Sequence, residues 1–114
     1  MYEEITEIKN YTPHVVSVLH EDKMVNIPIS GSVIRVVTRC TPNGYVMGLP
    51  IFLCTDGRID DLPEPEQGVM ILVSSVVARA AMRPDVISPD TSDAGSIRDG
   101  NGRIIGVKRF QCFV

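Results

Sequence analysis

Apolar and polar residues alternate over several short stretches in the first half of the chain, and this pattern predicts β-strands. Residues 15–20 and 24–29 are rich in β-branched side chains and flank the polar segment 21–23, so they predict a β-hairpin. Residues 33–40 alternate strictly, placing every second residue from Ile34 to Cys40 on one face. This segment predicts a third, half-buried strand.

Turn-forming residues divide the middle of the chain. Thr41–Gly44 predicts a turn, and residues 45–54 predict a fourth strand that is at an edge or bulged, because Gly48 and Pro50 interrupt it. Asp56–Gly57 predicts a further turn. The two prolines of residues 62–68 then predict a fixed connector that is neither helix nor central strand.

After the connector, residues 69–73 form a continuous apolar run, typical of a strand buried on both faces. Residues 76–83 predict a short helix that ends before Pro84. Small apolar side chains are expected to face the core: Val76, Val77, Ala80 and Ala81.

The last third is predicted to contain a long polar loop and one strand. Residues 84–101 predict a lid or a disordered segment, since they are polar and longer than most connections. Asp99–Gly102 predicts a turn, and residues 104–113 predict a last strand. The predicted fold class is therefore α+β, a mainly antiparallel β-sheet or open barrel of five to seven strands with one short helix.

Length and composition predict that residues 1–114 form a single domain with one aliphatic core. The chain has a mass of 12.5 kDa, and 44% of its residues are hydrophobic but only 5% aromatic. No apolar run approaches the length of a membrane helix. The acidic start, residues 1–7, is unlike a secretory signal, so a cytoplasmic location is expected.

The cysteines and the charge distribution limit the kinds of compartment and ligand that we expect for this protein. Cys40, Cys54 and Cys112 form no Cys-x-x-Cys pair, and their odd number predicts reduced thiols. The chain has 11 basic and 14 acidic residues, which argues against binding of long nucleic acids or anionic membranes. Residues 67–114 are nevertheless cationic, with six basic and four acidic groups.

Catalytic and metal-binding motifs are not visible in the sequence. His14 and His20 are expected to lie roughly 20 Å apart along one strand and so cannot share an ion. The chain has neither a P-loop nor a Gly-x-Ser-x-Gly turn, and Asp60–Asp61 is best interpreted as two solvated acids. We therefore predict a protein that is not an enzyme and needs no cofactor.

The junction between the predicted strand and helix is the strongest candidate for ligand binding. Free backbone N–H groups and the hydroxyls of Ser74 and Ser75 would suit a phosphate there. The alternative is that these serines only cap the helix. Arginines of the cationic half would pair with the phosphate, or would simply be solvated: Arg79, Arg83, Arg98, Arg103 and Arg109.

The chain resembles a group of small phage and prophage proteins. The resemblance is carried by residues 10–16, with the pattern Asn-Tyr-Thr-Pro-His, and by residues 31–36, 57–65, 71–80 and 98–106. It spans nearly the whole length. The resemblance implies a phage accessory protein acting in the host cytoplasm.

By analogy with small anti-defence proteins of phages, the resemblance implies a homo-oligomeric sponge. Such a protein sequesters a small phosphate-bearing immune signal of the cyclic-nucleotide type without cleaving it. Thr12 and His14 would line the pocket, and Tyr11 or Phe110 would stack a base. The alternative is a protein-binding module, an inhibitor of a host factor or a virion part, that uses strand edges and the tail Phe110, Phe113 and Val114.

Overall fold

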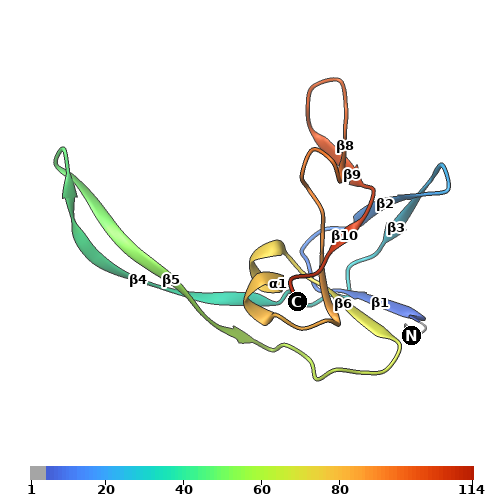
Figure 1. Cartoon of the computed structure of the whole chain (residues 1–114), viewed down its shortest axis with the longest axis horizontal. Helices are drawn as coiled ribbons and strands as arrows, with labels where there is room; N and C mark the ends of the chain where they lie inside the picture. Colours follow the sequence, from blue (N-terminus) through green and yellow to red (C-terminus); the bar gives the residue numbers. More distant parts are fainter. Residues whose placement is uncertain (1–4) are drawn as a thin grey trace.

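The computed structural model describes residues 5–114, so most of the acidic start that bears on export lies outside the described residues. The chain forms a body, which contains both termini of the described part, and a long two-stranded arm that extends away from it (Figure 1). The body is built from two four-stranded sheets and one helix.

The first sheet contains the core strands of the body. Its order is β1-β6-β7-β10, with these bounds: β1 Glu7–Asn10, β6 Val69–Leu72, β7 Val86–Pro89 and β10 Phe110–Gln111. β6 pairs in parallel with β1 and β7, and β10 closes the sheet antiparallel to β7. The predicted burial of β6 is confirmed, because Ile71 and Leu72 are fully or almost fully buried.

The second sheet confirms the predicted hairpin. Its order is β3-β2-β9-β8, with these bounds: β2 Val16–His20, β3 Lys23–Ile27, β8 Ser96–Arg98 and β9 Ile104–Val107. β2 and β3 are joined by Glu21 and Asp22, which both adopt positive φ (50° and 63°). This is the backbone twist that suits a tight two-residue hairpin.

Helix α1 (Ser75–Ala81) packs on the core beside β7, and it ends at Met82 in a left-handed conformation just before Pro84. The core cluster is aliphatic, as predicted: Ile34, Ile71, Val73, Val77, Ala78 and Val86. The predicted buried helix face needs correction. Val77 and Ala78 are buried, whereas Val76 and Ala80 are exposed, because the short helix meets the core along a narrower face than the sequence pattern indicates.

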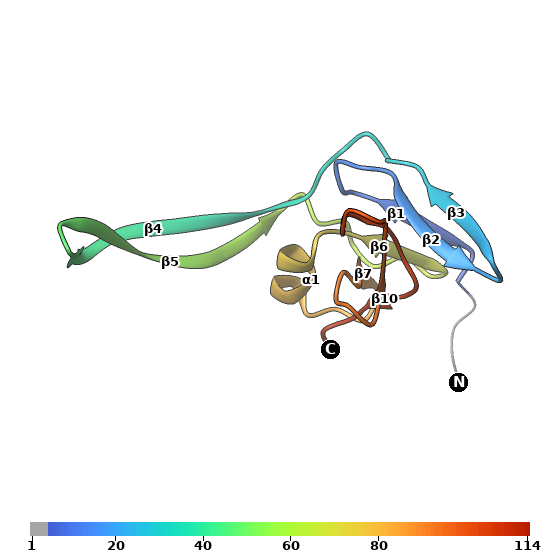
Figure 2. The same cartoon turned by 90° about the horizontal axis from the view of Figure 1, so that it is seen from above.

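The arm is a hairpin of two twelve-residue strands, β4 (Arg35–Val46) and β5 (Leu49–Asp60), which pair only with each other. It extends from one side of the body in both views (Figures 1 and 2). Only its root joins the core, where Val36 and Ile59 are paired and partly buried. Met47 and Gly48 form the turn, with φ of 51° and 78°.

Two predicted turns are therefore wrong, because they lie inside these strands. The segment Thr41–Gly44 lies in β4 at a register shift between Pro42 and Tyr45, where the Pro-Asn-Gly signal produces a bulge. Gly57 lies in β5, where a Cβ atom would come within 2.8 Å of the Val37 carbonyl oxygen. The glycine is needed for this close approach of two backbones and not for a reversal of the chain.

The prediction of reduced cysteines is wrong for two of the three. Cys40 and Cys54 lie directly opposite each other in the arm and form a disulfide, with their Cα atoms 4.1 Å apart. Cys112 is the free, exposed thiol. The pairing follows from the position of the turn, since residues 40 and 54 are nearly equidistant from Met47–Gly48.

The prediction of a long loop over residues 84–101 is also wrong. This segment contains β7 and β8, and Val86, Ile87 and Ser88 are buried. The predicted turn at Asp99–Gly102 is confirmed, and the predicted last strand is divided into β9 and β10. The fold is thus mostly β with one short helix, but it has more strands than predicted, mixed parallel and antiparallel pairing, and no closed barrel.

Candidate functional site

The arginines predicted to gather around a phosphate lie in separate places. Arg83 donates two hydrogen bonds to Asp85 (2.9 and 2.6 Å) and a third to the Pro63 carbonyl oxygen. These bonds raise the pKa of Arg83 and lower the pKa of Asp85. The Arg83 guanidinium thus links the proline-containing connector, residues 62–68, to the segment that follows helix α1.

Arg109 is occupied in a similar way. Its Nε lies 2.6 Å from Asp90 Oδ2, and the Asp90 carboxylate is buried. Hydrogen bonds from Ser92 and then from Arg109 lower the pKa of Asp90 from 3.8 to about 2. The pair joins the residue just before β10 to the residue just after β7, which is a structural role.

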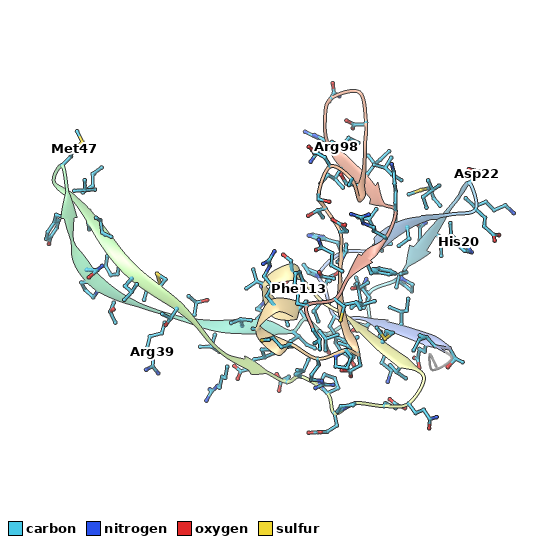
Figure 3. All side chains as sticks on the ribbon, viewed as in Figure 1. His20, Asp22, Arg39, Met47, Arg98 and Phe113 are labelled. Atoms are coloured by element: carbon cyan, nitrogen blue, oxygen red, sulfur yellow. A yellow bond between two sulfur atoms is a disulfide. The ribbon has the colours of Figure 1, made fainter. Side chains whose placement is uncertain are left out.

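The remaining arginines do not converge either. Arg98 donates to the Gly102 carbonyl oxygen within the β8–β9 hairpin, and Figure 3 shows it at a distance from the helix and from Phe113. Arg103 is exposed in the same turn. Arg79 lies over the Phe113 ring, 4.6 Å from its centroid. Their role in ligand binding stays a prediction.

The Thr-Pro-His segment forms a hydrogen-bonded turn between β1 and β2. Thr12 is buried, and its Oγ1 lies 2.6 Å from Asn10 Oδ1 and 2.9 Å from the His14 carbonyl oxygen. Asn10 Nδ2 in turn donates to the carbonyl oxygens of His14 and Ile27. The His14 side chain is exposed. The unusual sequence is thus explained by a buried backbone-binding network.

One concave site does bring two of the predicted residues together. Thr12 and Ser74 both line a depression of about 310 Å³ at the root of the arm, although they are far apart in sequence. The lining is mainly apolar and contains one cation: Tyr11, Thr12, Pro13, Val33, Ile34, Arg35, Val36, Ser74, Val76 and Val77. Ser74 is at the helix N-cap position but makes no side-chain capping bond. We call this depression the root pocket.

The arm carries the largest group of exposed apolar side chains. Met47 at the tip is 96% exposed, Tyr45 is 78% exposed and Leu49 is 65% exposed. Val46, Phe52 and Leu53 are each more than half exposed. Monomeric proteins seldom leave so large a group of apolar side chains exposed in one region, so the arm is the stronger candidate for a binding surface.

The charge pattern of the arm strengthens this assignment. Residues 41–55 contain no charged side chain, although both strands project into solvent. Exposed two-stranded ribbons are ordinarily protected by lysines or other charges along their edges. Charged groups lie nearer the root, where Val37, Arg39, Thr55, Gly57 and Arg58 line a second depression of about 470 Å³.

This surface is not evident from the sequence, because the apparent turns at residues 41–44 and 56–57 divide the arm into shorter strands. The signal that could have found it is the uncharged run itself, which has Cys40 just before its start and Cys54 just before its end. The tail that was predicted as the interface is a weaker candidate. Phe113 packs against the core cluster and Phe110 is half-buried in β10, so within this tail Val114 is the residue left largely exposed.

In residues 5–114, no group of three or more His, Cys, Asp and Glu side chains is placed to hold a metal ion. None of the helices within this range is long and apolar enough to cross a membrane.

Comparisons of the chain with protein-family models, with curated proteins and with solved structures find no match. The function is therefore inferred from the geometry and chemistry of this chain. Two features enter that inference: the apolar arm and the root pocket.

Proposed function

We propose that this protein is a non-catalytic protein-binding module that engages its partner through the β4–β5 arm. The observation that carries the proposal is the projection of an uncharged, apolar hairpin tip from a body that does not cover it. The body supplies a rigid attachment through Val36 and Ile59. A partner gains apolar contact area when it covers the tip, which is the dominant favourable term in protein association.

The disulfide supports this function by ordering the arm before binding. An isolated two-stranded hairpin is marginally stable in water, and this one lacks support from the body beyond its root. The Cys40–Cys54 bond joins the two strands near their middle. A covalently ordered arm loses less conformational entropy on binding, so more of the contact energy contributes to affinity.

Site-specific photo-cross-linking tests the proposal. A benzophenone amino acid replaces Phe52 on the arm in one variant and Ile105 on the body in a matched control, since both side chains are a little over half exposed. After irradiation of expressing cells, we expect a discrete protein adduct, identified by mass spectrometry, from the Phe52 variant only. Equal labelling from both positions, or no adduct from Phe52, would contradict the proposal.

A second candidate function is binding of a small phosphate-bearing ligand in the root pocket, as the phage sponge hypothesis requires. It is favoured by one observation: Thr12 and Ser74 meet there beside Arg35 and Tyr11. Arg35 would pair with the phosphate and Tyr11 would stack on a base. Within the described residues, no salt bridge holds Arg35 elsewhere.

Calorimetric titration with cyclic mono- and dinucleotides tests this second function. Arg35→Ala should abolish any binding, whereas Arg103→Ala, an exposed arginine on the β8–β9 turn, should leave it unchanged. Absence of heat with the wild-type protein, or equal losses in both variants, would remove the sponge hypothesis for these ligands.

A further inference from the structure

The chain exposes more surface than a compact monomer of its size. Its accessible area is 8261 Å², whereas a folded monomer of 12.5 kDa is expected to expose about 6,200 Å². The radius of gyration is 16.8 Å, against about 13 Å for a compact domain of this length. The excess of roughly 2,000 Å² is of the size that one subunit buries in a large, obligate homodimer interface.

The composition of the arm indicates the same kind of interface. Obligate interfaces between identical chains resemble a protein core and are poor in charge, whereas transient interfaces resemble the ordinary polar surface. Residues 41–55 have no charged side chain and include seven large hydrophobic residues that are exposed. In chain order they are Tyr45, Val46, Met47, Leu49, Ile51, Phe52 and Leu53.

The body offers an apolar receptor for the tip. The root pocket is lined by exposed Val33 and Val76 beside Tyr11 and Pro13, and its volume of about 310 Å³ can accept the side chains of a hairpin tip. The tip cannot reach the root pocket of its own chain, because the pocket includes residues 33–36 at the base of the arm and the arm extends away from the body (Figures 1 and 2). A second copy can present its root pocket to that tip.

The position of the pocket fits a symmetric exchange. The pocket includes residues 33–36, where β4 begins, so pocket and tip lie at opposite ends of the same arm. When two arms lie side by side in antiparallel directions, each tip reaches the root of the other arm whatever the arm length. Such an arrangement has a twofold axis and closes after two chains.

We propose that the protein is a homodimer in which the tip of each arm, centred on Met47, occupies the root pocket of the second copy. This proposal rests on the proposed function, because it names the partner of the arm. The same contact covers the apolar tip and the root pocket of each chain. It also leaves the root pocket filled in the dimer, so tip and small ligand would compete for it.

Chemical trapping tests the contact. In a Cys112→Ser background, which removes the free thiol, differently tagged Met47→Cys and Val33→Cys chains are mixed and treated with a short bismaleimide. We expect a covalent heterodimer from this pair. The pair Met47→Cys and Ile105→Cys is the control, because Ile105 is exposed on the body but lies outside the root pocket. Equal trapping in both pairs, or preferential trapping of Met47→Cys with itself, would overturn the proposal.

The mass in solution provides a second measurement that does not need cross-linking. Light scattering at micromolar concentration should give twice the chain mass for the wild type and the mass of one chain for Tyr45→Ser/Leu49→Ser. The control Ile104→Ser/Ile105→Ser removes two exposed residues of β9 and should remain dimeric. A wild-type protein with the mass of one chain at hundred-micromolar concentration would overturn the dimer. If Phe52 still gave a discrete adduct with another protein, the proposed function would survive and only this inference would fail.

Discussion

The body and the arm of this protein use similar residues for different purposes. In the body, aliphatic side chains of the first sheet and the helix are buried against one another, as at Ile71 and Val77. In the arm, leucines and valines of the same kind lie in solvent, as at Leu49 and Leu53. The body therefore has a core of its own, whereas the arm has only one pair of strands and a disulfide.

This difference teaches that apolar content alone does not locate a core. What distinguishes the two regions is the distribution of charge and the number of neighbouring strands. Four of the eight strands of the body, β2, β6, β7 and β9, have partners on both sides, but β4 and β5 have one partner each. An apolar segment that cannot be covered within its own chain is best explained by a partner outside it.

The largest expected effect comes from the core of the body. Leu72→Ala removes a fully buried side chain and should lower the free energy of unfolding by about 2–5 kcal/mol. Leu53→Ala, its counterpart on the arm, should change the unfolding of a dilute, monomeric chain by less than about 0.5 kcal/mol. Denaturant titration of both variants checks this, and similar losses at the two positions would mean that the arm belongs to the cooperative core.

Removal of the disulfide should act on the arm alone. Cys40→Ala/Cys54→Ala releases a loop whose ends are 14 residues apart, for which chain entropy predicts a loss of about 3 kcal/mol. Amide exchange in β4 and β5 should accelerate by about a hundredfold, because opening no longer has to break a covalent link. Amides of β6 and β7 serve as the internal control, and a comparable acceleration there would show that arm and body unfold together.

Acid should destabilise the body through Asp90. Because hydrogen bonds lower its pKa to about 2, this carboxylate stabilises the fold fully above pH 4, and the contribution is lost as the pH falls from about 4 to 2. The Asp90→Asn variant should therefore have a lower free energy of unfolding than the wild type at pH 7. Its free energy of unfolding should fall less than that of the wild type between pH 4 and pH 2. Asp93→Asn, at a fully exposed carboxylate, should follow the wild type. Identical acid profiles for wild type and Asp90→Asn would contradict this role.

The smallest expected effect lies at the contact between helix and tail. Phe113→Leu keeps an apolar side chain but removes the ring beneath Arg79, so the loss should be about 0.5–1 kcal/mol. A double-mutant cycle with Arg79→Met isolates the pair term. A coupling energy indistinguishable from zero would show that the contact contributes nothing beyond packing.

The sequence was informative where local chemistry decides the structure. The hairpin over β2 and β3, the buried strand β6 and the helix before Pro84 were all predicted, since each depends on neighbouring residues. The arm was not, because Pro42, Asn43 and Gly44 resemble a turn and only the pairing partner shows that they form a bulge. The burial of β7 was not predicted either, because the residues on both sides of this central strand are polar and resemble a loop.

The candidate site likewise depends on contacts between distant segments, which the sequence did not predict. The meeting of Thr12 with Ser74 depends on β1 and β6 being parallel neighbours, and neither segment alone indicates it. The five arginines looked equivalent in the sequence, yet Arg83 is held by Asp85, two residues away, and Arg109 by the buried Asp90, 19 residues away. For Arg109, pairing between segments that are distant in sequence decides whether the cation remains available to a ligand.

The most direct test of this division is the solution mass of a chain with a shortened arm. Replacing residues 40–54 by Asn-Gly joins the paired residues Arg39 and Thr55 through a tight turn and keeps the root of the arm. We predict that the body still folds, which the retained amide resonances of β6 and β7 would verify. The shortened chain should have the mass of a monomer, whereas the wild type should have the mass of a dimer. A shortened chain that assembles like the wild type, or a body that no longer folds, would contradict the account.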